Sequence, residues 1–233
     1  MRGRIGILLA VALTAGATVR PAGAQTATTT VTREDAARQV LSQRDDALKR
    51  GDRAAFLDTV DPSASEEFKA RQGRLFDGLR SLPLAFYELR LRTDEVPDLA
   101  GAALAGRYGA GTAFLPPVEA HYRLTGIDTI DAVDGYYYTF LLRGGRWRIV
   151  SDRDVEDVGL PSARNLWDYG PVSQQRTAHF TVFHDPADRK RAEALASLCE
   201  EAYARLTAGQ RLLRYSNPCS MIARRLTVSW SRN

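Results

Sequence analysis

The sequence predicts an α+β fold in which N-terminal helices pack on a curved, cone-like antiparallel sheet, followed by an incomplete strand-helix unit. Hydrophobic residues first recur with the period of a helix, and from Ala85 onward they alternate with the period of a strand. Strands that follow one another along the chain pair antiparallel, and helices that all precede them must cover the apolar face of the sheet. Gly144-Gly145 lies between two strand-like runs and predicts a hairpin.

Three helices are expected in the first part of the chain. Thr32 is the candidate N-cap of the first helix, and Gly51 fits its end. A short second helix covers RAAFLDTV, and Ser63 or Ser65 caps the third, EEFKARQGRLFDGLRSL. The first and third helices each carry one apolar face. These faces consist of Ala37, Val40, Leu41 and Leu48 in the first helix and Phe68, Leu75, Phe76 and Leu79 in the third.

Alternation of apolar and polar residues marks the strands. Ala85 and every second residue after it face inward in the first strand, and residues 93–117, rich in Gly, Ala and Pro, are expected to loop out. Tyr87, Tyr122 and Tyr138 fall on inward faces, where they are candidates for lining a ligand pocket between sheet and helices. The alternative is a packed core with the hydroxyls at its rim. The expected strands cover residues 85–92, 118–126, 136–143 and 146–152.

A second, smaller unit follows the sheet. Residues 177–185 have the pattern of a strand, and residues 187–209 form an amphipathic helix with a stripe that runs from Ala192 to Leu206 and includes Cys199. About 30 residues cannot bury a core alone. The unit must therefore dock on the first domain or begin something larger.

The N-terminus has the features of a secretory signal peptide. Basic residues precede the 15-residue apolar run from Ile5 to Val19, which is shorter than a membrane span, and a small-x-small site precedes Gln25. We expect cleavage after Ala24 and a secreted or extracytoplasmic protein with no membrane contact beyond residues 1–24. Residues 25–32 read as a flexible leader.

Basic residues are concentrated at the two ends. Residues 1–24 hold three Arg and residues 210–233 hold five, without any acid, so removing these eight from the net charge of +4 leaves −4 for residues 25–209. Since a nucleic-acid binder needs a basic face in its folded domain, no nucleic-acid partner is expected. The anomalous basic tail, residues 210–233, points to a reading-frame change or a truncated gene product, and the alternative is a genuine tail. Cys199 and Cys219 are expected to be unpaired.

The three histidines do not form a metal-binding pattern. His179 and His184 are five residues apart, which places them on opposite faces of a strand, so we expect both to be solvated at strand ends. His121 lies between Glu119 and Arg123 on an outward face, which favours a solvated charged strip over a His–carboxylate pair for acid–base work.

The acidic run after the last expected strand of the first domain is a candidate calcium-binding loop. It contains Asp152, Asp154, Glu156 and Asp157, without the oxygen spacing and turn glycine of a calcium loop. We expect a solvated loop.

The order of three helices and a curved sheet, with ALKRGDRAAFLDTVDP as its helix-Gly-Asp-helix opening and GGRWRIVSD as its closing hairpin strand, resembles the nuclear-transport-factor-2-like (cystatin-like cone) fold. A longer resemblance includes the segments FKARQGRLFDGLRSLPL, AHYRLTGID, YYYTFLLRGGRWRIVSD and LWDYGPV. Over roughly residues 33–209 the chain is similar to secreted bacterial proteins in which such a domain precedes a gluzincin-type (MA-clan) peptidase-like domain. The resemblance implies a first domain at 33–155, a linker at 156–177 and the start of a peptidase-like domain at 178–209. Trp167 and Tyr169 would pin the junction or cap the first core.

That family's catalytic signature is HExxH, whose histidines bind zinc and whose Glu acts on the zinc-bound water. No histidine of this chain is followed by Glu, so no catalytic residue carries over. We expect no cofactor, with zinc only if a complete peptidase domain existed, and no enzyme activity in the chain as given. Intact relatives would be zinc metallopeptidases.

The expected function is therefore an extracytoplasmic, non-catalytic ligand-binding or interaction domain with a small molecule or peptide as its partner. One alternative is a small enzyme or ligand binder that uses the tyrosine-lined pocket. Another is an accessory protein whose strand-helix unit is completed by a second chain.

Overall fold

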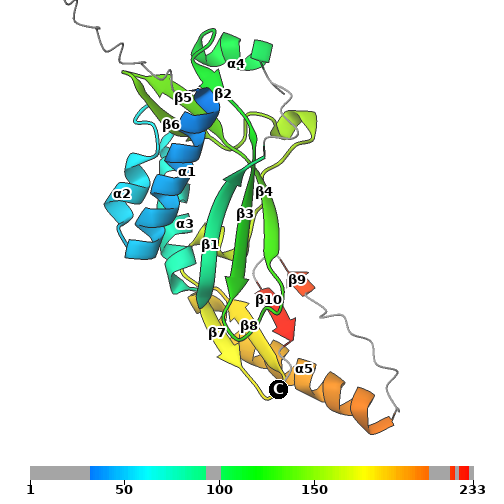
Figure 1. Ribbon diagram of the computed structural model, residues 1–233. Coiled ribbons are helices and arrows are strands. Elements are labelled where there is room, and N and C mark those ends of the chain that lie inside the picture. The colour runs from blue at the N-terminus through cyan, green and yellow to red at the C-terminus, as the bar shows by residue number, and fades with distance from the viewer. Residues whose placement is uncertain (1–31, 93–100, 210–220, 224–225, 231–233) are drawn as a thin grey trace, which may run out of the picture. The chain divides into compact units, whose positions relative to one another are not determined.

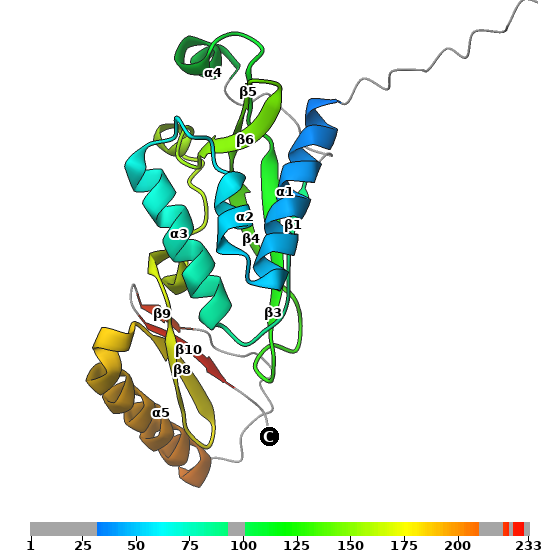
Figure 2. The same ribbon diagram turned by 90° about the vertical axis from the view of Figure 1, so that its left-hand side faces the viewer.

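Three helices on an antiparallel sheet dominate the structure, a computed structural model that describes residues 32–92, 101–209, 221–223 and 226–230. The chain divides into the units Met1–Thr30 and Val31–Asn233, and the described residues belong to the second. The helices, which cover one side of the strands (Figures 1 and 2), are α1 (Arg33–Arg50), α2 (Arg53–Asp58) and α3 (Glu66–Ser81). The α+β class predicted from the sequence is confirmed.

The helix ends follow the predicted signals. The Thr32 side chain caps α1 by accepting a hydrogen bond from the Asp35 amide, and Gly51 ends the helix in the left-handed region with φ 71°. Of the two candidate caps of α3, Ser65 is the one used, since its side chain accepts from the amide of Phe68.

The strands of the first part form two three-stranded sheets. One has the order β1-β3-β4, from β1 (Leu84–Leu91), β3 (Pro117–Leu124) and β4 (Ala132–Tyr137). The other has the order β2-β5-β6, from β2 (Ala113–Phe114), β5 (Thr139–Arg143) and β6 (Arg146–Ser151). All pairings within both sheets are antiparallel.

Two details of these strands differ from the prediction. The single strand expected over 136–143 is broken at Tyr138, so the chain leaves one sheet and enters the other while apolar alternation continues through the break. Ala85, expected to face inward, is exposed, because the register of β1 against β3 shifts between Leu84 and Phe86. The hairpin is as predicted: Gly144 and Gly145 both have positive φ, 56° and 75°, as a tight turn between twisted strands requires.

The described part of the predicted loop, residues 101–117, contains more regular structure than expected. Residues 93–100 lie outside the described part, and α4 (Gly101–Tyr108) and β2 follow. Leu104 is buried against Leu115 and Val155. The alanines of this segment are strong helix formers, and Tyr108 of the same helix packs against this cluster. The Gly and Pro content of this segment was therefore not sufficient to predict a loop.

The C-terminal part adds a four-stranded sheet and a long helix. Its sheet has the order β7-β8-β10-β9. The first strand, β7 (Ser173–Arg176), was missed because its sequence SQQR carries no apolar alternation. Two strands come from the tail that was expected to be anomalous. The remaining elements are η1 (Glu156–Val158), η2 (Leu166–Tyr169), β8 (Phe180–His184), η3 (Pro186–Asp188), α5 (Arg189–Gly209), β9 (Met221–Ala223) and β10 (Leu226–Trp230).

The hydrophobic residues of the C-terminal part are divided between two clusters. Phe183 belongs to the main core, which also contains the helix and sheet residues of the first part. Val182, Ala192 and Ala196 form a small cluster of their own. Leu206, expected in the buried stripe of α5, is 57% exposed.

The aromatic segment between the two parts packs on α3. Trp167 is buried in the main core with its ring edge-on to Tyr122 at 5.5 Å, whereas Tyr169 is 61% exposed. At Gly78 the helix comes so close to η2 that an added Cβ would lie 2.0 Å from the Trp167 carbonyl oxygen. Trp167 thus caps the first core, which was one of the two interpretations offered for it.

Candidate functional site

The three predicted site tyrosines lie in or beside the main core. Tyr87 and Tyr138 are 7% and 1% exposed, and Tyr122 is half-buried directly opposite Tyr87 in the β1–β3 register. Tyr136, which the sequence analysis did not single out, stacks on Tyr138 with ring centroids 5.4 Å apart. Burial raises the pKa of Tyr87, Tyr122 and Tyr136, and raises that of Tyr138 to about 12.

Buried carboxylates, which come from α1 and η2 and not from the strands, accompany these tyrosines. Asp45 of α1 accepts a hydrogen bond from the Leu89 amide at 2.9 Å, and Asp168 of η2 accepts one from Asn165 at 2.8 Å. The second carboxylate oxygen of each has no hydrogen-bond partner among the described residues. Burial raises the pKa of both carboxyl groups to about 7.

Arg44 of α1 is a fully buried cation. Its guanidinium donates to the Thr59 hydroxyl at 2.8 Å and to the Gln72 side-chain oxygen at 2.6 Å, and it lies 3.9 Å from the centroid of the Phe56 ring. These partners are neutral. The sequence did contain a signal, because Arg44 falls between Leu41 and Leu48 on the apolar face of its helix.

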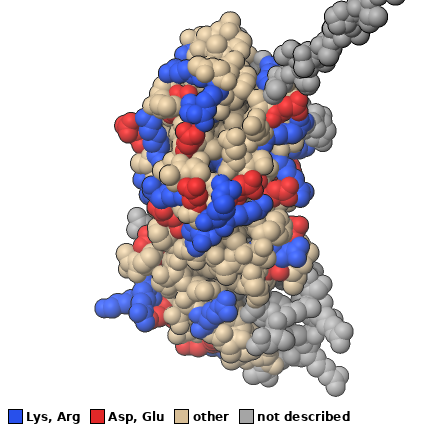
Figure 3. All heavy atoms as spheres, turned by 60° about the vertical axis from the view of Figure 1, so that its left-hand side comes forward, with Lys and Arg blue, Asp and Glu red and all other residues tan. Residues whose placement is uncertain are grey.

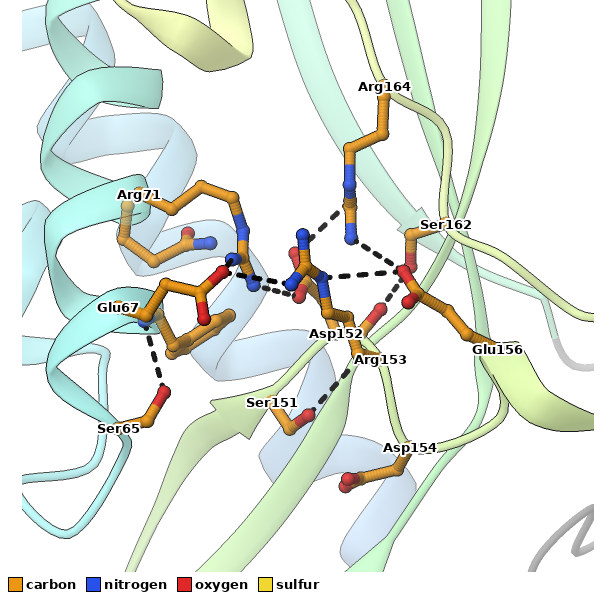
Figure 4. A network of polar contacts seen from close by, with 12 residues as sticks. Ser65, Glu67, Arg71, Ser151, Asp152, Arg153, Asp154, Glu156, Ser162 and Arg164 are labelled. Carbon is orange, nitrogen blue, oxygen red and sulfur yellow. Dashed lines mark hydrogen bonds and ion pairs between the residues drawn. The ribbon is translucent and has the colours of Figure 1, made fainter.

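An ion-pair network ties α3 to the loop after β6 (Figure 4). Arg71 pairs with one carboxylate oxygen of Asp152, and Arg164 approaches the other at 3.2 Å. Glu67 extends the network at 2.9 Å from Arg153. Because guanidinium groups engage both Asp152 oxygens, we interpret the network as a structural one that holds the loop after β6 against α3.

The prediction of a solvated acidic loop is wrong for two of its members. The side chains of Asp152 and Asp154 are only 3% and 4% exposed. Asp154 receives hydrogen bonds from the Tyr108 hydroxyl at 2.9 Å and the Thr139 hydroxyl at 2.7 Å, and it pairs with Arg107. The loop folds back because these partners on α4 and β5 satisfy a carboxylate that sequence spacing could not connect to them.

A groove of about 460 Å³ lies between α1 and β6. Its volume is in the range of ligand-binding sites. One face of α1 provides a buried floor and two exposed side-chain amides. The start of β6 provides the half-buried indole of Trp147 and two guanidinium groups. The end of α2 provides the carboxylate of Asp58 and the hydroxyl of Thr59. The lining residues are Ala36, Gln39, Val40, Gln43, Asp58, Thr59, Gly145, Arg146, Trp147 and Arg148.

Charge in this groove is predominantly positive. Asp58 is shared by Arg146 at 2.8 Å and Arg148 at 3.3 Å, and the hydrogen bond from Arg146 holds the pKa of Asp58 below its ordinary value. Thr59, which lines the groove, accepts its hydrogen bond from the buried Arg44. Two guanidinium groups, those of Arg146 and Arg148, therefore share the single carboxylate of Asp58.

The three histidines lie in three different environments. His184 is 3% exposed, which corrects the prediction of a solvated side chain, because β7 and β10 flank it on both sides of β8. His179 stacks on Tyr203 at 3.9 Å and pairs with Glu200 at 2.8 Å. His121 pairs with Glu119 at 3.0 Å, with its side chain 16% exposed, so the strip it belongs to is only partly solvated.

Other candidate features can be placed only within the described residues. There, no group of three or more His, Cys, Asp or Glu side chains is arranged to hold a metal ion. No helix in the described part combines the length and apolar character that crossing a membrane requires. The Cys199 thiol is free, and Cys219 lies outside the described residues. Basic and acidic side chains are interspersed on the face shown in Figure 3.

The fold and groove define an α+β protein with helices on one side of an antiparallel sheet. No family model matches the chain, and no curated protein matches it. Among solved structures, it is similar to an NTF-2 like protein of unknown function from Shewanella oneidensis MR-1. The identity is 17% and the TM-score 0.34, over 51% of this chain and 94% of that chain. A likeness of this strength carries no argument about function.

Proposed function

We propose that the protein is an extracytoplasmic, non-catalytic ligand-binding or interaction domain that binds its ligand in the α1–β6 groove. The observation that carries this proposal is the groove itself. It is a hollow of about 460 Å³ with a buried floor, exposed amides on α1 and the indole of Trp147 on β6. Polar groups placed around a floor of Ala36 and Val40 can fix the orientation of a ligand.

The main alternative places the ligand or a reaction among the interior tyrosines. Asp45 and Asp168 favour it, since each has a buried oxygen without a partner among the described residues. The stacking of Tyr136 on Tyr138 and the burial of Tyr87 favour a packed core instead. The alternative predicts that Tyr87→Phe or Tyr138→Phe alters binding or activity.

A partner-binding role for the C-terminal part has separate support. Leu198 and Leu206 of α5 are 60% and 57% exposed, so their apolar side chains are accessible to a partner. This role predicts a stable complex that is lost when residues 178–209 are deleted. Size-exclusion chromatography of both forms from native extracts measures it.

The proposals on location and origin rest on the residues. Cleavage after Ala24 predicts an extracytoplasmic protein whose first residue is Gln25, which N-terminal mass spectrometry detects. We also propose that the chain is the N-terminal part of a metallopeptidase-like protein that lacks its zinc motif. Resequencing the gene downstream of codon 205 tests this, because another frame should then continue into HExxH.

Filling the groove tests the proposed binding surface. Gln43→Trp places a large side chain in the groove from an exposed position of α1, whereas Ser42→Trp makes the same change at an exposed neighbour that does not line it. In a fragment screen by saturation-transfer NMR on the full chain, we expect hits that survive Ser42→Trp and vanish with Gln43→Trp. Hits retained equally by both variants, or no hits at all, would contradict the proposal.

A further inference from the structure

We propose that the groove takes an extended peptide segment with two acidic side chains spaced two residues apart. This inference rests on the proposed function, because it names the ligand of the same groove. It is carried by three features: the excess of positive charge, the spacing of two arginines on β6, and the outward-pointing backbone groups of Trp147 at the edge of that strand.

The charge in the groove calls for an anionic ligand. Arg146, whose side chain is 59% exposed, makes its hydrogen bond to Asp58 through Nη2, which leaves its other N–H groups to bind a further acceptor. Arg148 adds a second positive charge, so the two arginines of the groove outnumber the single carboxylate of Asp58. Carboxylates match guanidinium groups in both charge and planar geometry.

The spacing of the arginines matches an extended chain. Arg146 and Arg148 are two residues apart on β6, and both reach Asp58, so they share one face of the strand about 7 Å apart. A peptide that lies beside β6 places its alternate side chains at the same interval on the same face. Opposite charges that face each other in this way stabilise strand pairing.

The outer edge of β6 offers backbone groups for such pairing. β6 is at the end of its sheet in the described part, and the N–H and C=O of Ile149 point outward to Thr59 and Asp61. Hydrogen-bonding direction alternates along an antiparallel strand, so the backbone groups of Trp147 point to the same side. Leu142 of β5, which lies opposite Trp147, supports this direction. Its N–H bonds to Thr112 and not to Trp147, so the backbone groups of Trp147 do not point toward β5.

The opposite wall complements a peptide backbone. Gln39 and Gln43 are one helical turn apart on α1, exposed, and line the groove. Each amide side chain can donate to a peptide carbonyl and accept from a peptide N–H. The groove therefore has the strand edge at Trp147 on one wall and paired amides on the other. An exposed strand edge is what a peptide uses when it adds a strand to a sheet.

Two matched peptides test the inference on the full chain. The probes are an acetylated and amidated pentapeptide of sequence Gly-Asp-Val-Asp-Gly and its counterpart with both Asp replaced by Asn, titrated by isothermal calorimetry and by backbone NMR. We expect the acidic peptide to bind about five- to tenfold more tightly at low salt, as two solvated ion pairs allow, with the difference shrinking at high salt. The amide of Trp147 should shift.

Variants assign the effect to the groove. Arg146→Gln should abolish the preference for the acidic peptide, whereas Arg90→Gln, which also removes an exposed arginine paired with a carboxylate, should keep it. Equal binding of both peptides at Trp147 would overturn the acidic preference and leave the groove as a binding surface. Absence of shifts at Trp147 with either peptide would overturn the inference, and the Gln43→Trp screen then judges the proposed function separately.

Discussion

Gly78→Ala tests how closely the segment around Trp167 packs on α3. A Cβ at this position would lie 2.0 Å from the Trp167 carbonyl oxygen and 2.7 Å from that of Gly170, whereas ordinary contact begins at 3.4 Å. Both atoms belong to the backbone, so no side-chain rotation relieves the overlap. The helix and η2 must separate by about 1.4 Å to bring this contact from 2.0 to 3.4 Å, which loosens the packing of Trp167 in the core.

The expected loss follows from two opposing terms. Overpacking against backbone costs about 3 kcal/mol, the upper end of its usual range. Replacing a mid-helix glycine with alanine gains about 1 kcal/mol. Gly78→Ala should therefore lower the free energy of unfolding by about 2 kcal/mol and Tm by about 4–8 °C.

Gly73→Ala is the matched control in the same helix. Its Cβ would meet only the mobile end of the Arg53 side chain, at 2.5 Å from Nη2, and that side chain can move away. The helix gain is the same, so this variant should be neutral or up to about 1 kcal/mol more stable. Urea unfolding of both variants, followed by circular dichroism, measures the difference. Equal stability of the two variants would refute the close packing of η2 on α3.

Two further predictions concern buried carboxylates. Asp152→Ala leaves Arg71 and Arg164 without their buried partner, so it should lower the free energy of unfolding in urea by about 3 kcal/mol. Glu67→Ala, in the exposed part of the network, should lower it by only about 0.5 kcal/mol. Equal losses would contradict the structural role of the buried ion pairs. Asp168→Asn should stabilise the protein at pH 8. The folded pKa of Asp168 is raised to about 7, above its unfolded value, so the folded chain binds the proton more tightly and stability falls as pH rises from about 4 to 7. The gain should therefore shrink by at least about 1 kcal/mol at pH 5, and a pH-independent gain would contradict the raised pKa.

Periodicity and capping residues predicted most of the local structure. Thr32, Gly51 and Ser65 end helices where their side chains or backbone favour it, and Gly144-Gly145 makes the hairpin. These signals act within a few residues, which is why sequence alone reveals them.

Features that depend on contacts between distant residues were not predicted. Asp152 and Asp154 looked solvated because their partners lie on α3, α4 and β5, far away in sequence. His184 is buried because β10 pairs with β8, and strand pairing of that range leaves no local pattern. The break at Tyr138 is likewise a property of two sheets and not of one strand.

In the candidate site, too, local patterns could be predicted and contacts between distant residues could not. The inward position of Tyr87 and Tyr138 follows from alternation, and the structure places both in the core. The groove could not be derived, since it combines α1, the end of α2 and β6. Arg44, which donates to the groove residue Thr59, does have a local signal, because it is a charged residue on an apolar helix face.

The most direct test of the proposed function is a map of backbone amide shifts for the full chain with the strongest hit of the fragment screen. We expect the largest shifts at Gln39, Gln43 and Trp147, on the two walls of the groove. Shifts concentrated at Tyr87 and Tyr138 would place the ligand in the interior of the sheet and contradict the groove as the binding surface.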